Sequence, residues 1–442
     1  MTRYDGQHVL QIGLGVSGVS ALAYLSARGA VVDVTDSRAE PPGLAQAQAQ
    51  LPAEQIVVGG LRAPRALNDY RLAVVSPGLP SDLPLLAELR TAGVPLVGDI
   101  ELFAREAAAP VLAVTGSNGK STVVTLLGRM AEAAGVRAAI GGNLGPAALD
   151  LLDDAVELYV LELSSFQLEQ TDSLAARAAV VLNLSEDHLD RHGNMDAYAR
   201  AKARIYNQCE YAIYNRDDAR VVSMCNGSHS FGLGQPDHDE YGLRQRDGRE
   251  WIARGEQCLV ALDELKIAGR HNAANAMAAL AMAEAAGLAQ AACLQALREF
   301  EGLPHRCQWV AERGGVIYLD DSKGTNVGAA VAALEGMPGP VVWLGGGQGK
   351  GQDFSPLRPV LAGKARAALL FGEDAGLMAA VLEGSVAIER TETLQQAVSR
   401  AAQLAQPGDR VLLSPACASL DQFRSYIERG RCFADAVGEL AQ

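Results

Sequence analysis

Residues 115–122, Thr-Gly-Ser-Asn-Gly-Lys-Ser-Thr, are the part of the sequence whose spacing points most directly to chemistry. They follow an apolar run and precede a stretch with helical character from Val123 to Ala134. A strand, a glycine loop, Gly-Lys-Ser and a helix are typical of a phosphate-binding loop, where backbone N–H groups and a helix N-terminus surround a polyphosphate. Lys120 would reach the outer phosphates of ATP, and the Ser121 hydroxyl suits Mg²⁺. The two glycines lie closer together than in the usual loop, and a glycine turn without a ligand is the alternative.

The overall composition is that of a soluble, globular protein of several domains. The chain has 442 residues, 49% of them hydrophobic and 20% charged, which predicts two or three domains. The formal net charge of −14 argues against a nucleic-acid partner, because binding to nucleic acid relies on clustered Lys and Arg. The first residues contain no apolar signal core, and the Ala-rich run 273–283 is too short and too polar to span a bilayer. We therefore expect no membrane insertion.

The cysteines indicate a reducing compartment. There are seven, and no two of them form a Cys-x-x-Cys pair. An odd number of scattered cysteines is typical of reduced, mostly buried thiols in a cytoplasmic protein.

The N-terminal residues predict a strand–helix–strand unit with a glycine-rich turn. Strand-like residues 8–12 precede the turn 13–18, Gly-Leu-Gly-Val-Ser-Gly, and a second strand, 31–35, ends at Asp36. An acid about twenty residues after such glycines is typical of a dinucleotide fingerprint. The pattern leaves three alternatives open, namely a nicotinamide cofactor, another nucleotide, or close packing of helix on strand.

Two further strands of the central region end in groups that suit metal ions. Glu162 lies in the apolar run 158–163, where a carboxylate is costly unless it is paired or binds a metal. A salt-bridged structural Glu is one alternative, and a Mg²⁺ ligand beside the phosphate loop is the other. The strand 179–184 precedes acids and histidines that suit a second metal. His188 and His192 lie four apart, so a zinc pair is formally open, although no cysteine or third histidine is near.

Lys202 lies in a helical stretch among alanines. A lone lysine on a face of small residues usually extends its amine to water. The residues alone predict no other role for it.

The C-terminal region repeats the pattern of a strand followed by polar or glycine-rich residues. The strands 316–319, 341–344 and 411–414 are each followed by such a cluster, which predicts a crevice at the carboxyl edge of a parallel sheet. Alternating strands and helices make all three regions α/β. We predict a Rossmann-like domain at 1–98, a central phosphate-loop ATPase-like domain with a mostly parallel sheet at 99–303, and a Rossmann-like domain at 304–442.

Four motifs together resemble the Mur ligases, the ATP-dependent enzymes that add amino acids to the peptidoglycan precursor. They are the loop 115–122, Gly-Arg-His-Asn-Ala-Ala-Asn at 269–275, Leu-Pro-His-Arg at 303–306 and Asp-Ser-Lys-Gly-Thr-Asn at 321–326. Within the family, residues 413–423 resemble the members that add D-glutamate, and the Asp-Asn-Pro-Arg signature of the diamino-acid-adding members is absent. The resemblance implies that the first domain holds uracil and diphosphate rather than a nicotinamide dinucleotide.

The resemblance also implies a reaction and its cofactors. ATP would phosphorylate the alanyl carboxylate of UDP-N-acetylmuramoyl-L-alanine to an acyl phosphate, and the amine of D-glutamate would attack it, giving ADP and phosphate. This is a cytoplasmic step of peptidoglycan synthesis. The resemblance implies two Mg²⁺ ions, an N6-carbamylated Lys202 and a monomeric enzyme.

The family motifs assign a role to individual residues of this sequence. The catalytic residues implied are Lys120, His188 and Lys202. The metal ligands implied are Ser121, Glu162, His188 and Lys202. The ATP-binding residues implied are Gly116, Ser117, Asn118, Gly119, Lys120, Ser121, Thr122, Asn272, Arg306, Asp321 and Lys323. The UDP-precursor residues implied are Val16, Ser17, Asp36, Ser37, Gly78, Asn143, Ser164, Gln167 and His188. The D-glutamate residues implied are Thr325, Lys350, Ser419 and Tyr426.

Two positions depart from the family pattern. Gln348 replaces an aspartate of the family, so it could not serve as an anionic contact, and Tyr426 replaces a phenylalanine.

Two other classes of function remain open. An NAD-dependent oxidoreductase and a non-catalytic nucleotide-binding module are the alternatives, and neither would release phosphate in response to D-glutamate. Because three α/β units must converge on one reaction, we also expect the third domain to close about a hinge near 302–306.

Overall fold

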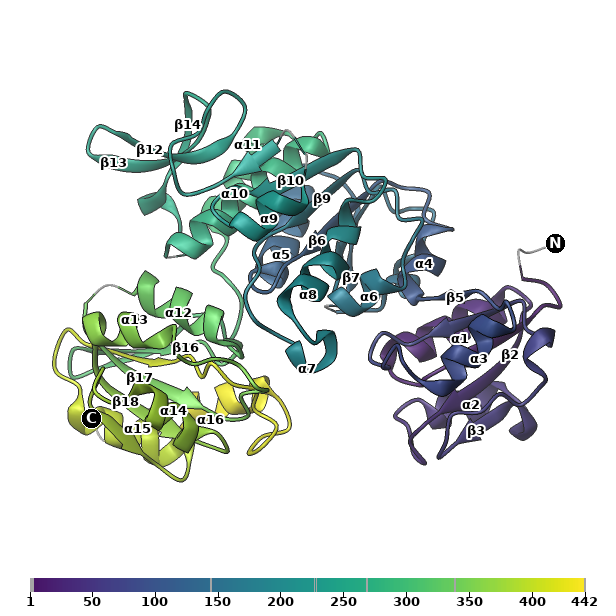
Figure 1. The fold of residues 1–442 in the computed structure, drawn as a ribbon. Helices are drawn as coiled ribbons and strands as arrows, with labels where there is room; N and C mark the ends of the chain where they lie inside the picture. The colour runs from purple at the N-terminus through teal and green to yellow at the C-terminus, as the bar shows by residue number, and fades with distance from the viewer. Residues whose placement is uncertain are drawn as a thin grey trace.

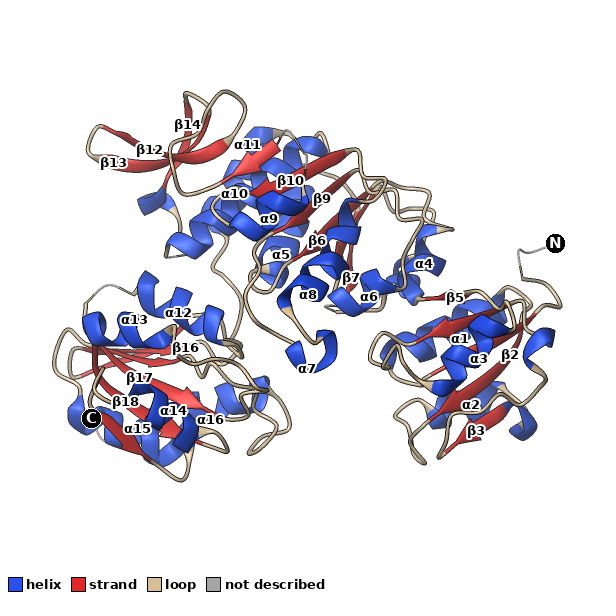
Figure 2. Cartoon of the chain, in the orientation of Figure 1, coloured by secondary structure: helices blue, strands red, loops and turns tan. Residues whose placement is uncertain are grey.

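Three α/β units follow one another along the chain, each built around its own sheet. The computed structural model describes residues 4–143, 145–225, 227, 229–267, 269–337 and 339–440. Figures 1 and 2 show the three sheets and the helices that cover them. Within this described part, no helix is long and apolar enough to cross a membrane. The prediction of a three-domain α/β fold is confirmed, while the boundaries after residues 98 and 303 remain a prediction.

The first unit has a five-stranded parallel sheet in the order β3-β2-β1-β4-β5. Its strands are β1 His8–Ile12, β2 Val31–Asp36, β3 Ile56–Val58, β4 Leu72–Val75 and β5 Leu96–Val97. Its helices are α1 Val16–Ala27, α2 Leu44–Gln50 and α3 Pro84–Thr91. Pro95, which has no N–H to donate, directly precedes β5, and β5 is the edge strand of the sheet.

The glycine-rich turn after β1 serves close packing of the chain on itself. A Cβ added at Gly18 would lie 2.0 Å from the backbone oxygen of Gly13, so only glycine allows α1 to start there. Gly13 itself has a φ of +93°, which side chains rarely adopt. Helix α4 Asp99–Ala104 then leads to the second unit. Gly98 is its N-cap, and Asp99 is its first residue.

The central unit has nine strands in the order β14-β13-β12-β11-β10-β9-β6-β8-β7. All neighbours from β12 to β7 pair in parallel, and β12, β13 and β14 pair antiparallel. The strands are β6 Val111–Thr115, β7 Ala138–Gly142, β8 Leu158–Glu162, β9 Ala178–Val181, β10 Tyr211–Asn215, β11 His229–Phe231, β12 Tyr241–Arg246, β13 Arg249–Arg254 and β14 Gln257–Ala261. The three antiparallel strands form the arm at the upper left of Figure 1. Strands β12 and β13 form a hairpin, and Asp247 and Gly248, both with positive φ, form its tight turn.

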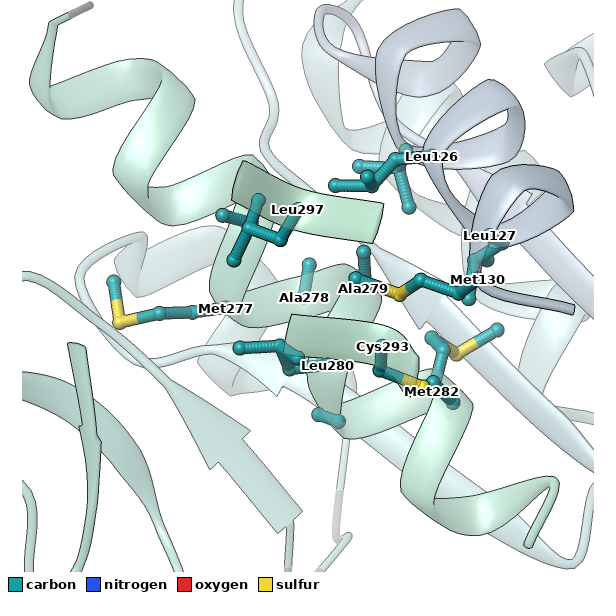
Figure 3. Close-up of a cluster of buried hydrophobic side chains, with 14 of the residues drawn as sticks. Leu126, Leu127, Met130, Met277, Ala278, Ala279, Leu280, Met282, Cys293 and Leu297 are labelled. Carbon is teal, nitrogen blue, oxygen red and sulfur yellow. The ribbon is translucent and has the colours of Figure 1, made fainter. Parts of the chain in front are cut away.

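The phosphate-loop helix is fixed by a three-helix core. The three helices of this core are α5 Lys120–Ala133, α10 Arg270–Ala285 and α11 Gln290–Glu299. The other helices of the central unit are α6 Ser165–Glu169, α7 Leu189–His192, α8 Met195–Ala203 and α9 Ala219–Met224. Figure 3 shows Leu127 and Met130 of α5 facing α10 and α11 in one buried cluster. The small alanines of α10 let these helices approach closely. This packing holds the start of α5, and therefore the phosphate loop, in one position.

The C-terminal unit has six strands in the order β15-β16-β20-β17-β18-β19. They are β15 Gln308–Arg313, β16 Val316–Asp320, β17 Val341–Gly346, β18 Ala365–Phe371, β19 Ile388–Arg390 and β20 Arg410–Leu413. The helices are α12 Val327–Gly336, α13 Leu357–Lys364, α14 Ala375–Leu382, α15 Leu394–Leu404 and α16 Tyr426–Gly438. Neighbouring residues of one strand, such as Val341 and Val342, belong to separate clusters on the two faces of the sheet. Strand β15 is antiparallel to β16, so this sheet is mixed.

We predict that residues of the core behind the phosphate loop contribute more to the stability of the central domain than surface residues do. Val124 of α5 is fully buried, and Val222 of α9 in the same domain is 42% exposed. Val124→Ala should lower the free energy of opening by about 2 kcal/mol, because it removes two buried methyl groups and leaves a cavity. Val222→Ala should change it by less than about 0.5 kcal/mol. Hydrogen exchange of central-domain peptides measures both values, and equal effects would contradict the prediction.

Candidate active site

A cavity of about 520 Å³ lies where the central and C-terminal domains meet. The start of the phosphate-loop helix forms one wall, and loops after β16 and the start of α12 form the opposite wall. Apolar side chains such as Phe231 and Leu233 line one part of it. Seven of the residues predicted to bind ATP line the cavity, namely Asn118, Gly119, Thr122, Asn272, Arg306, Asp321 and Lys323.

The phosphate loop has the backbone shape that its glycines predict. Gly116 and Gly119 have φ of +150° and +86°, and a Cβ at Gly119 would lie 2.3 Å from the side-chain oxygen of Asn275. The Lys120 amine donates to the backbone oxygens of Gly116 and Ser117, at 2.7 and 2.8 Å. Burial lowers the pKa of Lys120, and the charges of Glu162 and Asp187 oppose that shift. The loop therefore presents a buried amine where phosphate groups would lie.

Glu162 ends β8 beside the phosphate loop and is 3% exposed. Its Oε1 accepts a hydrogen bond of 2.8 Å from the Asn143 side chain. Its Oε2 is buried and has no hydrogen-bond partner within the described part of the chain. A buried carboxylate oxygen without a partner is costly. The structure thus brings Glu162 together with Asn143 and leaves one oxygen available to a ligand.

Lys202 is buried, so the expectation that its amine reaches water is wrong. The residue is 2% exposed, because α8 packs it beneath the phosphate loop. Its Nζ donates to Thr115 Oγ1 at 3.2 Å and to the Gly116 backbone oxygen at 3.0 Å, and lies 4.8 Å from the Tyr198 ring centre. Burial, together with the charge of Lys120, holds the pKa of Lys202 well below its ordinary value. The amine therefore loses its proton more readily than an exposed lysine does.

His188 and His192 do not form a zinc pair. His192 is occupied by Ser165 Oγ at 2.9 Å and by Glu169 Oε1 at 3.4 Å. His188 lies beside Phe166, on which His192 also stacks, and has a φ of +54° and an Nε2–Oδ2 distance of 3.7 Å to Asp187. Burial lowers the pKa of His188. Among the described residues, no three His, Cys, Asp or Glu side chains group as metal ligands.

Arg306 bridges from the interdomain segment to the phosphate loop. Its Nη2 donates to Ser121 Oγ at 2.7 Å, and burial lowers its pKa. The residues on either side, His305 and Cys307, have φ of +61° and +50°. His305 pairs with Asp320 at 2.6 Å, which attaches this part of the expected hinge to the C-terminal domain.

Two titratable groups after β16 have strongly shifted pKa values. Burial raises the pKa of Asp321 to about 7, although hydrogen bonds from Ser414 and other groups oppose the shift. Burial, with the charges of Arg306 and Lys120, lowers the pKa of Lys323 to about 8. The Lys323 amine lies 4.0 Å from the Tyr426 ring centre.

The residues predicted to bind D-glutamate come from three loops that are held together at the carboxyl edge of the C-terminal sheet. The backbones of Gln348 and Ala418 exchange hydrogen bonds of 3.0 and 2.9 Å. Arg429 of α16 is fully buried and donates to Ser322 and to the Cys417 backbone oxygen. These contacts position the loops that carry Thr325, Lys350, Ser419 and Tyr426. The Lys350 amine points to the central domain, 3.7 Å from Asp187 Oδ1.

The residues predicted to bind the UDP precursor lie at two separate sheet edges. In the first domain, Val16 is 74% exposed and Ser37 and Gly78 are also exposed. Asp36 accepts from the Leu14 N–H at 2.8 Å and from Arg38, and these hydrogen bonds outweigh burial and lower its pKa.

In the central domain, Ser164 and Gln167 form a reciprocal capping box at the start of α6. The buried carboxyl of Asp99 lies beside Ser17 of the first domain and Gln167 of the central domain. Asp99 thus links the two predicted groups.

Sequence reasoning missed several residues of the site. Asn183 fixes the loop by exchanging hydrogen bonds with the Asn118 backbone at 2.8 and 3.1 Å. His271 and Asn275 line the cavity from α10, and the motif at 269–275 contained the signal for both. Phe231 lines the cavity from a three-residue strand, and no local pattern distinguishes it from core.

Family descriptions match nearly the whole chain. "Mur ligase MurD-like, N-terminal domain" matches residues 7–98, "Mur ligase middle domain" matches 114–283, and "Mur ligase, glutamate ligase domain" matches 305–417.

Similar proteins and solved structures agree with these matches. A UDP-N-acetylmuramoylalanine--D-glutamate ligase of Pseudomonas aeruginosa is 52% identical over 437 residues, 97% of each chain. One of Methylobacillus flagellatus is 49% identical and covers 100% of this chain and 98% of its own. The fold is similar to that of MurF ligase from Thermotoga maritima in complex with ADP, with a TM-score of 0.63, 16% identity and coverage of 99% and 97%. It is also similar to MurC from Thermotoga maritima, with a TM-score of 0.60, 19% identity and coverage of 97% and 98%.

We predict that ATP affinity falls as the pH rises through about 8, because the pKa of Lys323 in the cavity is about 8. Below that pH the amine is a cation that attracts phosphate, and above it the amine is neutral. Calorimetric titration of ATP about one unit below and one unit above this value measures the effect. Lys323→Arg keeps its charge at both values and should lose most of the pH dependence. A decline of equal size in both proteins would assign the effect to another group.

Proposed function

The chain belongs to the Mur ligase family, and on that premise we propose that it uses ATP to join D-glutamate to UDP-N-acetylmuramoyl-L-alanine. The observation that carries the proposal is the identity of 52% with a relative bearing that name, over 97% of both chains. The cavity between a phosphate loop and the C-terminal domain supports it. We also place the protein in the cytoplasm, as a monomer, in agreement with its seven free cysteines.

The reaction has two steps. Both need positive charge near the phosphate oxygens and correct placement of the reacting groups. A carboxylate oxygen of the alanyl group attacks the terminal phosphorus of ATP, and ADP leaves with the bridging oxygen. The amine of D-glutamate then attacks the carbonyl carbon, loses a proton, and the phosphate leaves with its bond to carbon broken. Lys120, Arg306 and Lys323 bring three cations to this space and would stabilise the phosphate oxygens.

The residues fit a Mg²⁺ ion beside the terminal phosphates. Glu162 offers a buried carboxylate oxygen without a partner, and Ser121 offers a hydroxyl at the start of α5. Both are oxygen ligands of the kind that Mg²⁺ prefers. When bound, the ion neutralises charge that develops on the phosphate oxygens. Arg306, which now donates to Ser121, would then turn its guanidinium to phosphate.

A second Mg²⁺ would be held by His188 and by a carbamate on Lys202. The uncharged amine of Lys202 can attack the carbon of CO₂ and release one proton, which leaves an anionic carbamate. The lowered pKa of Lys202 supports this step, because only the uncharged amine is a nucleophile. The carbamate would supply anionic oxygens that His188 alone does not offer.

The amino-acid and precursor sites would lie on either side of the phosphate loop. Lys350 would pair with a carboxylate of D-glutamate, beside Thr325, Ser419 and Tyr426. Because Gln348 is neutral, it adds no negative charge near that carboxylate. The UDP portion would bind at the first domain, where Val16, Ser17, Asp36, Ser37 and Gly78 lie. Asn143, Ser164, Gln167 and His188 would hold the muramoyl end near the phosphate loop.

Phosphate release tests the proposed function directly. The protein is mixed with ATP, Mg²⁺ and UDP-N-acetylmuramoyl-L-alanine, and phosphate is measured with D-glutamate, L-glutamate, a diamino acid or no addition. Release that depends on D-glutamate alone supports the proposal. Release with another amino acid would reassign the specificity, and none with any would favour a passive nucleotide-binding protein or an oxidoreductase.

We predict that Glu162→Gln lowers ATP turnover by about a hundredfold or more, because a neutral amide cannot replace the carboxylate at a metal ion. The amide oxygen can still accept from Asn143, so the fold should persist. Glu157→Gln makes the same chemical change at an exposed position of the same domain and should leave turnover unchanged. Steady-state kinetics and circular dichroism measure both variants. A folded Glu162→Gln protein with near-normal turnover would remove Glu162 from the metal site.

We predict that Lys202→Ala is folded, nearly inactive, and partly restored by short-chain carboxylates. The substitution deletes the proposed carbamate and leaves space in which acetate can supply carboxylate oxygens. Acetate and chloride are compared at equal ionic strength, and only acetate should restore phosphate release. Lys266→Ala removes an exposed lysine of the same domain and should respond to neither salt. Equal responses of the Lys202→Ala protein to both salts would rule out the carbamate.

A further inference from the structure

The structure contains an interdomain contact at the edge of the cavity, made by Asn326, which does not line the cavity, and by Gly328, which does. Asn118 of the phosphate loop meets Asn326, which caps α12 of the C-terminal domain. The Asn118 Nδ2 donates to Asn326 Oδ1 at 3.2 Å, and the Asn326 Nδ2 donates to Asn118 Oδ1 at 3.1 Å. Two amides that bond reciprocally fix both distance and orientation, so this pair is sensitive to small movements between the domains.

The cap of α12 determines which way the Asn326 amide points. Its Oδ1 accepts from the Ala329 N–H at 2.8 Å, as an N-cap oxygen does. The nitrogen of the amide must therefore point to the central domain. Asn326 is 3% exposed, and its Nδ2 also lies 3.5 Å from Asp187 Oδ2. One buried side chain thus connects the start of α12 with the phosphate loop and with the loop that carries His188.

The backbone of α12 approaches the central domain just as closely. A Cβ added at Gly328 would lie 2.6 Å from Ser185 Oγ and 2.7 Å from Ser185 Cβ. Gly328 lies inside the helix, where alanine is normally more stable than glycine. The requirement for glycine at this position therefore comes from the other domain and not from the helix itself.

The central-domain side of the contact is also fixed. The Asn118 backbone is held by Asn183, and the Asn118 side chain donates to Ser185 Oγ at 3.3 Å. On the C-terminal side, the Val327 N–H donates to Gln352 Oε1 at 2.9 Å, which ties the start of α12 to the loop of Lys350. Each half of the contact is thus held by hydrogen bonds within its own domain.

We propose that Asn118, Ser185, Asn326 and Gly328 form a docking contact that holds the C-terminal domain against the phosphate loop, with Asn326 as a positioning residue for the ligation. Asn326 does not appear among the described residues that line the nucleotide cavity. It acts through Asn118 on the phosphate loop and brings Lys350 to the face where His188 lies. The catalytic part of this inference rests on the proposed function, whereas the docking itself does not.

Five variants of the full chain, including Ser185→Gly alone as a reference, test the docking contact. Asn326→Ser keeps an oxygen to cap α12 but is too short to reach Asn118. Gly328→Ala inserts a methyl group between the domains and leaves every polar group in place. Ser185→Gly, added to Gly328→Ala, removes the two atoms that the methyl group would meet. Gly363→Ala in α13 is the matched control, because its Cβ would meet no described atom within 4 Å.

Small-angle scattering with saturating ADP and the phosphate-release assay are the two measurements. Asn326→Ser and Gly328→Ala should have a larger radius of gyration than the wild type. Their kcat should be about tenfold lower, the size expected for two lost hydrogen bonds. Gly363→Ala should match the wild type. The double variant Ser185→Gly/Gly328→Ala should have the radius of gyration and the kcat of Ser185→Gly alone. If Gly328→Ala instead disturbed α12 itself, Ser185→Gly would not correct it.

Each outcome decides a separate point. If Asn326→Ser and Gly328→Ala both have the radius of gyration and the kcat of the wild type, the docking contact is overturned. Failure of the double variant to recover would overturn the steric argument at Gly328. If Asn326→Ser does not fold, Gly328→Ala and its double variant decide alone. If the wild type itself releases no phosphate with D-glutamate, the proposed function fails, and scattering still decides whether the domains dock in this way.

Discussion

The burial of several cations around Glu162, the carboxylate that interacts with all of them, is the constraint on which this site depends. Burial lowers the pKa of Lys120, Lys202, Arg306 and Lys323, and in the three lysines a neighbouring cation lowers it further. Glu162 opposes the shift in all four. Two of these cations belong to the central domain, one to the interdomain segment and one to the C-terminal domain. Bringing the domains together therefore concentrates positive charge, which is costly until an anion joins it. A polyphosphate supplies that anion, so the same group that reacts also stabilises the arrangement in which it can react.

The rest of the fold keeps that arrangement from relaxing. Repulsion between the cations would push the phosphate loop away from its neighbours if the loop were flexible. However, α5 begins directly at Lys120 and packs on α10 and α11 in a continuous core. On the other side, the fully buried Arg429 joins the loops after β16 and β20 through three hydrogen bonds. The strain of the site is thus confined to a few backbone positions, such as Cys307 and His188, that have positive φ without being glycine.

The sequence predicts the architecture and the chemistry of single loops well, because both depend on local pattern. Strand β1 was predicted with its observed bounds, and the residues of the phosphate loop have the predicted backbone shape. Lys202 shows where local pattern fails. Alanines around a lysine predict an amine in water, yet tertiary packing places this amine under the loop, and only the family resemblance indicated another role. Asn326 was visible as the end of a motif, but its partner, Asn118, lies 208 residues away, and no local spacing encodes that pair. The antiparallel strand β15 was missed because none of its residues is fully buried, so this edge strand carries a weak apolar signal.

The order of the two chemical steps explains why docking by neutral amides is useful in a site so rich in charge. An acyl phosphate reacts with water as well as with an amine, so water must stay excluded between the steps. The proposed transfer divides the negative charge of the phosphate chain between ADP and the acyl phosphate, so contacts made only through phosphate would rearrange at that moment. Hydrogen bonds between Asn118 and Asn326 do not depend on the charge of the nucleotide. They would persist through the proposed transfer of the phosphoryl group, and would keep Lys350, with the amino acid that we propose it binds, against the loop of His188 until the amine has attacked.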